Sequence, residues 1–282
     1  MKIGVTGATG QLGRIVIEKL KAKIPAADIV ALVRTPSKAA GLGVEARAFD
    51  YDKTEGLADA LKGIDRLLLI SANEPGKRLK QHENAIDAAK AAGVKFLAYT
   101  SLLRADSTTL VLGPEHLGTE KLVKASGIPY AILRHGWYIE NYFGGLDHVI
   151  ESGELVGSAG NGKISAATRE DFAEADVAVL IGEGHNNKIY ELAGDNGFTL
   201  AEFAKTLGEV SGKPVSYKNV PVNDFAAALA QGGLPEPVAQ FFAGTHVATE
   251  KGDLFDESKE ISKLAGRPTT SLKAAVQQFL SN

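Results

Sequence analysis

The 282-residue sequence contains no cysteine. This absence excludes disulfide bonds, thiolate metal sites and a cysteine nucleophile, and it is typical of a protein in a reducing compartment. The sequence also lacks an N-terminal apolar stretch of signal-peptide length, and no run approaches the roughly 20 apolar residues that span a bilayer. We therefore expect a cytoplasmic protein that has no membrane segment.

A charge excess of either sign is missing too. Lys and Arg number 31 against 34 Asp and Glu, which gives a formal net charge of −3. Because no large positive field is available to hold a nucleic-acid backbone, we do not expect DNA or RNA as a ligand. The six histidines lack the HxxxH and HExxH spacings of metal sites, so we expect no metal.

What the sequence does contain is a regular alternation of short apolar runs and helical segments. The apolar runs lie at residues 2–7, 28–34, 44–50, 66–71, 95–101, 130–134 and 188–194. Helical spacing is found between them at residues 13–23, 54–62, 79–92, 115–126 and 169–181. This alternation predicts an α/β fold of the Rossmann type, in which a doubly wound parallel sheet carries crossover helices on both faces.

The pattern loosens after Arg134, where Gly and turn residues become frequent. A chain of this length can form one large α/β domain or two smaller ones. We expect residues 1–135 to form the sheet domain, with returns at about 168–197. Residues 136–282 are expected to form a smaller C-terminal domain that is interleaved with the sheet.

The first apolar run leads directly into a glycine-rich turn, "TGATGQLG". In a βαβ unit, this turn brings the backbone close to a pyrophosphate and starts a helix whose N-terminal amides face the anion, which glycine permits sterically. The spacing is GxxGxxG, not the GxGxxG of typical dehydrogenases. We predict that this turn holds a dinucleotide through Gly7, Ala8, Thr9, Gly10, Gln11, Leu12 and Gly13. A tight turn without a ligand is the alternative.

The second apolar run ends in Arg34, where a dehydrogenase specific for NAD carries Asp or Glu to bind the ribose hydroxyls. A guanidinium instead suits a 2′-phosphate, and Lys38 lies one helical turn further, so we favour NADPH over NADH. Alternatively, Arg34 is a solvated residue at a strand end.

Polar residues also follow the third and fourth apolar runs. Asp50 is placed to approach the adenine, although carboxylates at strand ends are also frequent helix caps. The loop of Ser71, Ala72 and Asn73 falls in the crevice beyond the carboxyl ends of the strands, where doubly wound folds bind ligands. We expect this loop beside the ribose or the nicotinamide, on topology alone.

The motifs "TGATGQLG", "YTSLL", "LRHGWYIEN" and "GRPTTSL" together resemble the NmrA-like branch of the atypical short-chain dehydrogenase/reductase family over essentially the whole chain. The resemblance implies a Rossmann domain and a smaller substrate-binding domain. It implies NADPH as the reductant, with NADH possible, no flavin, and a quinone-like small molecule as the acceptor. It also implies that, besides the residues above, the cofactor is lined by Gly136, Trp137, Tyr138, Ile139, Glu140 and Asn141.

One departure from the wider family concerns its Tyr-x-x-x-Lys pair, which places an acid/base group beside the nicotinamide. At that spacing this chain has His116 and Glu120. His116 can in principle donate a proton, but we favour a surface pair on one helix face. Alcohol oxidation, which needs a proton shuttle, is correspondingly disfavoured.

Quinone reduction requires less of the protein: proximity, an apolar slot for the ring and a dipole that meets the developing oxyanion. The stretch "GWYIENYF" offers such groups. We predict Asn141 and Tyr138 as catalytic residues, and Trp137, Tyr142 and Phe143 as walls of the substrate slot. The alternative is an aromatic cluster that seals the junction of two lobes. Both roles can hold, each for different residues of this aromatic set.

The sequence therefore favours an NADPH-dependent, flavin-free reductase of quinones or similar electron-poor aromatics. Two alternatives stay open. The first is a sensor that binds nicotinamide nucleotides without turnover, and the second is a reductase of azo or triphenylmethane dyes. No sequence feature specifies the oligomeric state.

Overall fold

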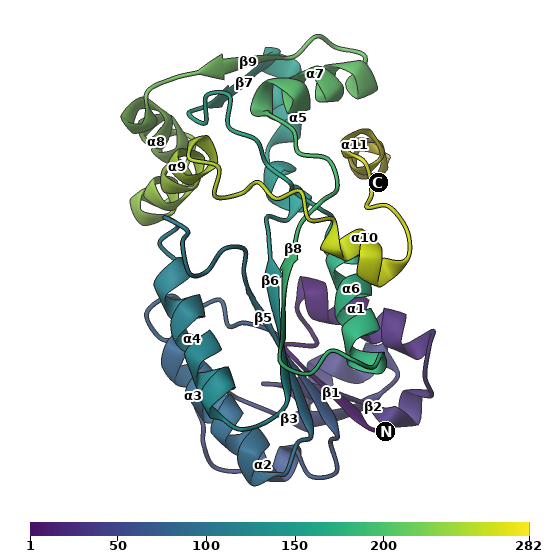
Figure 1. Cartoon of the computed structure of the whole chain (residues 1–282). Helices are drawn as coiled ribbons and strands as arrows, with labels where there is room; N and C mark the ends of the chain where they lie inside the picture. The colour runs from purple at the N-terminus through teal and green to yellow at the C-terminus, as the bar shows by residue number, and fades with distance from the viewer. Residues whose placement is uncertain (282) are drawn as a thin grey trace.

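The computed structural model describes residues 1–281. Within them, a seven-stranded parallel sheet runs in the order β3-β2-β1-β4-β5-β6-β8 (Figure 1). The strands are β1 (Ile3–Thr6), β2 (Ile29–Val33), β3 (Glu45–Ala48), β4 (Arg66–Leu69), β5 (Phe96–Leu102), β6 (Tyr130–His135) and β8 (Lys188–Leu192). Each predicted apolar run forms one of these strands, so the doubly wound α/β prediction is confirmed.

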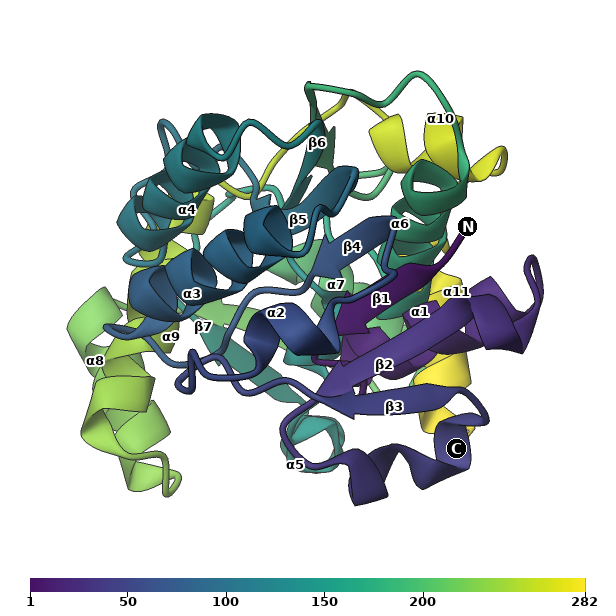
Figure 2. The same ribbon diagram turned by 90° about the horizontal axis from the view of Figure 1, so that it is seen from below.

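Helices cover both faces of the sheet (Figure 2). One face carries α1 (Gln11–Lys21), α6 (Arg169–Ile181) and α10 (Glu260–Ala265), and the other carries α2 (Leu57–Ala60), α3 (Arg78–Ala91) and α4 (Gly113–Ala125). The helix predicted at residues 54–62 was wrong in extent. It starts only after Gly56, which has a left-handed φ of 82°, and it is one turn long.

The strands bury side chains on both faces, as expected for a sheet covered by two helical layers. In β2, every residue is buried. Because successive side chains point to opposite faces, Ile29, Ala31 and Val33 join the core beneath α1 and α6, whereas Val30 and Leu32 join the core beneath α2, α3 and α4.

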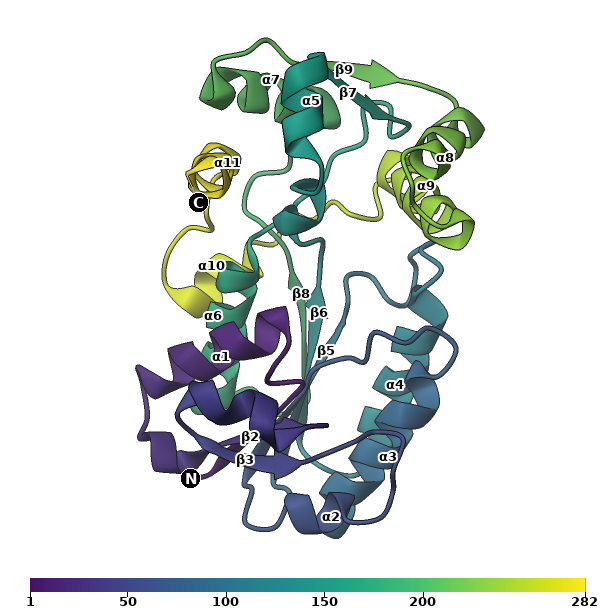
Figure 3. The same cartoon turned by 180° about the vertical axis from the view of Figure 1, so that it is seen from behind.

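A smaller lobe lies beyond the carboxyl ends of β5, β6 and β8 (Figure 3). It contains α5 (Leu146–Ser152), β7 (Glu154–Gly157), α7 (Leu200–Ser211), β9 (Ser216–Asn219), α8 (Val222–Gln231), α9 (Glu236–Glu250) and α11 (Leu272–Leu280). The chain enters this lobe after β6, returns to the sheet for α6 and β8, and then enters it again. None of the helices described in residues 1–281 is both long and apolar enough to cross a membrane.

The glycine turn between β1 and α1 is compact because its glycines approach one another. Gly7 has a left-handed φ of 59°, and its carbonyl accepts a hydrogen bond from the Gly10 amide at 2.8 Å. A Cβ at Gly13 would lie 2.4 Å from the Gly7 oxygen and 2.7 Å from the Ala8 Cα. The repeat of three therefore lets the first turn of α1 pack directly on the end of β1.

His116 and Glu120 do not form the expected surface pair. They lie on α4 and are 4% and 0% exposed, and they bind different partners. A His116 ring nitrogen lies 2.8 Å from the Tyr99 hydroxyl, whereas Glu120 accepts hydrogen bonds from Ser101 at 2.7 Å and Arg134 at 2.8 Å. The helix face that carries them packs on β5 and β6, so both side chains point into the interior.

Three histidines are buried as neutral rings. Burial lowers the pKa of His82 and of His116 to about 3, with the Arg78 charge adding to the effect, and it lowers the pKa of His246 to about 4. The neutral state is also what the local hydrogen bonds need, because a His246 ring nitrogen accepts from the Ser158 amide at 3.0 Å.

These histidines make the fold sensitive to acid. Below about pH 6.5 an unfolded histidine binds a proton that the buried ring does not, so the free energy of unfolding falls as the pH drops toward 4, by about 1.4 kcal/mol per pH unit for each ring. We expect His246→Gln to reduce this slope in denaturant titrations between about pH 7 and pH 5. His148→Gln, at an exposed histidine, serves as the control, and equal slopes for the two variants would contradict the expectation.

The glycine turn gives a second test. Gly13→Ala forces a Cβ onto backbone atoms, and we expect it to lower the free energy of unfolding by about 1–3 kcal/mol. Gly41→Ala is the matched control because a Cβ at that position meets no atom within 4 Å. Urea titration of both variants measures the difference. If Gly13→Ala were as stable as Gly41→Ala, the close approach of Gly13 to the Gly7 backbone would not contribute to stability.

Candidate functional site

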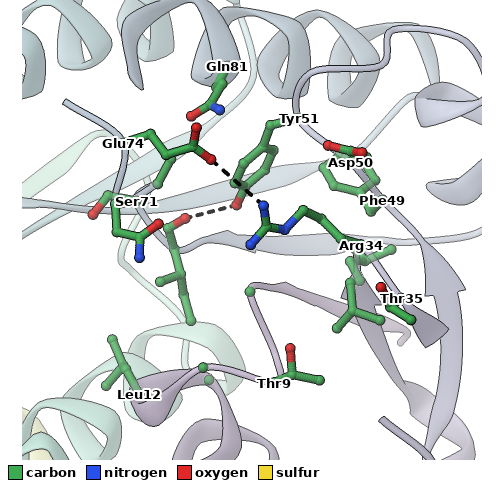
Figure 4. A pocket seen from close by; sticks show the side chains of 18 of the residues that line it. Thr9, Leu12, Arg34, Thr35, Phe49, Asp50, Tyr51, Ser71, Glu74 and Gln81 are labelled. Carbon is green, nitrogen blue, oxygen red and sulfur yellow. Dashed lines mark hydrogen bonds and ion pairs between the residues drawn. The ribbon is translucent and has the colours of Figure 1, made fainter. Parts of the chain in front are cut away.

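A cavity of about 390 Å³ lies at the point where the strand order reverses, beyond the carboxyl ends of β1, β2 and β4 (Figure 4). Ligands of doubly wound folds bind at this position. Many of the residues predicted to hold a cofactor line it: Gly7, Thr9, Gly10, Gln11, Leu12, Gly13, Arg34, Lys38, Asp50, Ser71, Ala72 and Asn73. Segments far apart in the sequence thus meet in one site.

The glycine turn presents bare backbone to this cavity. Gly10 is the N-cap of α1 and supplies no side-chain hydrogen bond, and the first turn holds no acidic residue. The first amides of the helix therefore keep their partial positive charge, which suits an anion such as a diphosphate. Ala8 was also predicted to contact the cofactor, but its side chain is 0% exposed and packs in the core below the turn.

The cationic end of the cavity is formed by the segment after β2. The Arg34 side chain is 70% exposed, and Lys38 lies on the 3-10 helix Pro36–Leu42 that follows it. In Figure 4, Arg34 extends into the cavity toward Glu74, and the two side chains form a long ion pair of 3.8 Å. An exposed guanidinium at this place can bind a phosphate bidentately.

The sequence did not reveal every lining residue. Additional contributions come from Leu32, Val33, Thr35, Phe49, Tyr51, Asp52, Ile70, Glu74 and Gln81. The Tyr51 hydroxyl donates to the Ile70 carbonyl at 2.9 Å, and burial raises its pKa. Tyr51 directly follows Asp50 at the end of the third apolar run, so the same strand-end reasoning could have predicted its position. Gln81 lies on α3, and no local motif marks it.

The loop after β4 is held by buried polar side chains. The Ser71 amide donates to the Thr100 hydroxyl at 2.9 Å, and the Ala72 amide donates to the neutral His82 ring at 2.8 Å. Arg78 in turn donates to the Ala72 carbonyl at 2.7 Å. The loop that carries Ser71 and Asn73 into the cavity is therefore fixed at its base.

The segment Gly136–Asn141 runs from the end of β6 into the 3-10 helix Ile139–Tyr142 and does not line this cavity. A His135 ring nitrogen lies 3.1 Å from the Tyr138 hydroxyl, and the other lies 2.8 Å from a carboxylate oxygen of Asp176. Burial, with the Asp176 charge, raises the pKa of Tyr138. The Arg169 guanidinium covers the Tyr138 ring at 4.4 Å. A cofactor contact by this segment stays a prediction.

Asn141 is exposed, and its amide has a defined orientation. Its Oδ1 accepts a hydrogen bond from Arg169 at 3.1 Å, and Arg169 is itself held by Glu140 through an ion pair of 3.3 Å. Because the oxygen is engaged, the NH₂ group is the part of the Asn141 amide that can donate to a further group.

The aromatic residues after β6 serve mainly as packing. Trp137 and Phe143 are 7% and 9% exposed and belong to the core of the smaller lobe, where Phe143 stacks on Phe279 at 4.5 Å. Tyr142 lies 5.7 Å from Phe203, ring to ring. This packing favours the alternative of a cluster that seals the junction, and contact of these rings with a substrate stays a prediction.

No group of three or more His, Asp or Glu side chains in the described chain is arranged to hold a metal ion. The lining of the cavity instead suits an anion. Backbone amides and cationic side chains converge on it, and apolar side chains such as Leu32 and Ile70 complete its wall.

Comparison with known proteins agrees with this geometry. Residues 7–181 match a family model described as NAD(P)H-binding. The chain is 50% identical to Quinone oxidoreductase 2 of Escherichia coli (strain K12), with 99% of each chain covered. It is 30% identical to the NmrA-like family domain-containing oxidoreductase flvB of Aspergillus flavus, with 99% of this chain and 95% of that protein covered.

Solved structures are similar over their whole length. The crystal structure of the NADPH-dependent quinone oxidoreductase QOR2 from Escherichia coli complexed with NADPH has a TM-score of 0.96 at 51% identity and covers 99% of this chain and 100% of that one. The Citrobacter sp. triphenylmethane reductase complexed with NADP(H) has a TM-score of 0.95 at 40% identity, with 99% and 100% covered. The chain therefore belongs to the NAD(P)H-binding, NmrA-like family of proteins.

Proposed function

We propose that the protein is an NADPH-dependent, flavin-free reductase that passes a hydride to quinones or similar electron-poor aromatic rings. The observation that carries the proposal is the cavity in which the bare amides of α1 and the Arg34 guanidinium face the same space. The full-length similarity to a quinone oxidoreductase, at 50% identity, supports the choice of acceptor.

The residues of the cavity fit the parts of NADPH. The amides at the start of α1 suit the diphosphate, and Arg34 with Lys38 suits the 2′-phosphate. Asp50 and the Ser71–Asn73 loop line the same cavity, and we expect Asp50 beside the adenine and the loop beside a ribose or the nicotinamide. When bound, NADPH supplies a hydride from C4 of its nicotinamide ring.

The acceptor needs a place beside that ring and a group that stabilises negative charge on its oxygen. Asn141 offers an NH₂ donor on an amide whose oxygen Arg169 holds, and we expect this donor to meet the developing oxyanion. Tyr138 is the other residue that we propose as catalytic, and its hydroxyl is paired with His135. The hydroquinone anion takes its proton from water or a nearby donor, which is consistent with the absence of a Tyr-x-x-x-Lys pair.

A dye reductase is the second candidate. It is favoured by the 40% identity and the TM-score of 0.95 with the triphenylmethane reductase. The two candidates share the reductant and the hydride transfer and differ only in the acceptor. We also propose a cytoplasmic location and a quinone-like small molecule as the substrate.

Turnover tests the proposal directly. The purified protein is mixed with NADPH and 1,4-benzoquinone, and the loss of nicotinamide absorbance is followed, with a triphenylmethane dye as a parallel acceptor. We expect oxidation of NADPH with the quinone. Nucleotide binding without turnover on either acceptor would favour the sensor instead, and no nucleotide binding would reject both.

Asn141 can be tested by substitution. We expect Asn141→Ala to lower kcat for benzoquinone by up to about 100-fold, because one oxyanion donor is lost, with little change in the Kd for NADPH. Asn186→Ala is the control, since Asn186 is exposed and precedes β8 at the opposite end of the sheet. Steady-state kinetics give the result, and an unchanged kcat for Asn141→Ala would remove this residue from the mechanism.

A further inference from the structure

The guanidinium assigned to the 2′-phosphate already has an anionic partner inside the cavity. Glu74 lines the same cavity, and its Oε1 lies 3.8 Å from an Nη atom of Arg34 (Figure 4). The other oxygen of the Glu74 carboxylate lies 3.4 Å from the Lys77 ammonium. The carboxylate is therefore shared between a cation of the nucleotide site and a cation outside the lining.

The backbone of Glu74 is fixed, so this arrangement is built into the loop. The amides of Lys77 and Arg78 both donate to the Glu74 carbonyl at 3.1 Å. The neighbouring Gly76 amide donates to Glu115 at 2.9 Å, and Glu115 pairs with the buried Arg78 at 3.0 Å. The Glu74 side chain itself is 37% exposed, so it can change its rotamer while its backbone stays in place.

We propose that Glu74 is a specificity-determining residue that competes with the 2′-phosphate of NADP(H) for Arg34. The inference rests on the proposed binding of a nicotinamide nucleotide in this cavity. A phosphate that binds Arg34 competes with the carboxylate for the guanidinium and comes close to a second negative charge. Both effects weaken NADP(H) binding.

NAD(H) has a hydroxyl in place of this phosphate, so the pair between Arg34 and Glu74 can persist when it binds. Glu74 therefore lowers the preference for the phosphorylated nucleotide below the level that Arg34 alone would give. The effect is modest, because the pair is long and its arginine is 70% exposed. An exposed ion pair of this kind changes a binding constant by up to about fivefold.

Isothermal titration calorimetry of the full-length protein with NADP⁺ and with NAD⁺ tests the inference. We expect Glu74→Gln to lower the Kd for NADP⁺ by about two- to fivefold and to leave the Kd for NAD⁺ unchanged. The gain should shrink at high salt, where exposed charges are screened. Glu83→Gln is the matched control, because Glu83 is 40% exposed, pairs with Lys80 at 2.8 Å and lines no part of the cavity.

A double-mutant cycle with Arg34→Gln isolates the coupling between the two residues. We expect Arg34→Gln to weaken NADP⁺ binding, and Glu74→Gln to bring a smaller gain in that background than in the wild type. The inference is overturned if Glu74→Gln leaves the Kd for NADP⁺ unchanged or raises it. It is also overturned if the variant weakens NAD⁺ binding, since Glu74 would then be a ribose ligand.

The outcomes for the wild-type protein separate this inference from the proposed function. If the wild type binds neither nucleotide, the proposed function fails, and the inference fails with it. If the wild type binds NADP⁺ and Glu74→Gln behaves as Glu83→Gln does, the inference alone fails.

Discussion

The structure depends on the contact between the first turn of α1 and the end of β1. The Gly7 carbonyl accepts the Gly10 amide at 2.8 Å, and Gly13 lies so close that no side chain fits between the two segments. This contact sets the direction of α1, and with it the direction in which the free amides of the helix point. Because α1 also packs against α6, the turn holds one helical layer of the sheet in place as well as one wall of the cavity.

Charged side chains are buried beside β5 and β6. Arg134 is 4% exposed and pairs with Glu120 at 2.8 Å and with Glu191 at 2.7 Å. Removing one partner of such a network would leave a buried charge without compensation. The helix position that carries an acid/base pair in the wider family thus serves the packing of α4 in this chain.

Much of the fold could be predicted from the sequence, because buried parallel strands are recognisable as short apolar runs. The residues of the cavity that lie at strand ends, such as Arg34 and Asp50, could be predicted for the same reason: topology alone brings these ends together. The positions of Gln81 and Glu74 in the cavity could not be predicted. Their place in the cavity depends on how the loop after β4 folds back, and buried His82 and Arg78 determine that path.

The burial of His116 and Glu120 shows a second limit. A His and a Glu four residues apart look like a solvated pair when only the helix is considered. Whether that face meets water depends on where α4 packs, and the partners Tyr99 and Arg134 come from two different strands. Charged and aromatic partners this far apart in the sequence carry no local signal.

The path of the chain between the two lobes limits how the protein can be divided. After β6 the chain builds part of the smaller lobe, returns for α6 and β8, leaves again, and comes back for α10 before it ends in α11. Neither lobe is therefore a continuous piece of the gene. Exchange of the smaller lobe between relatives would require several simultaneous splices, so this lobe is more readily altered by point substitutions than by recombination of modules.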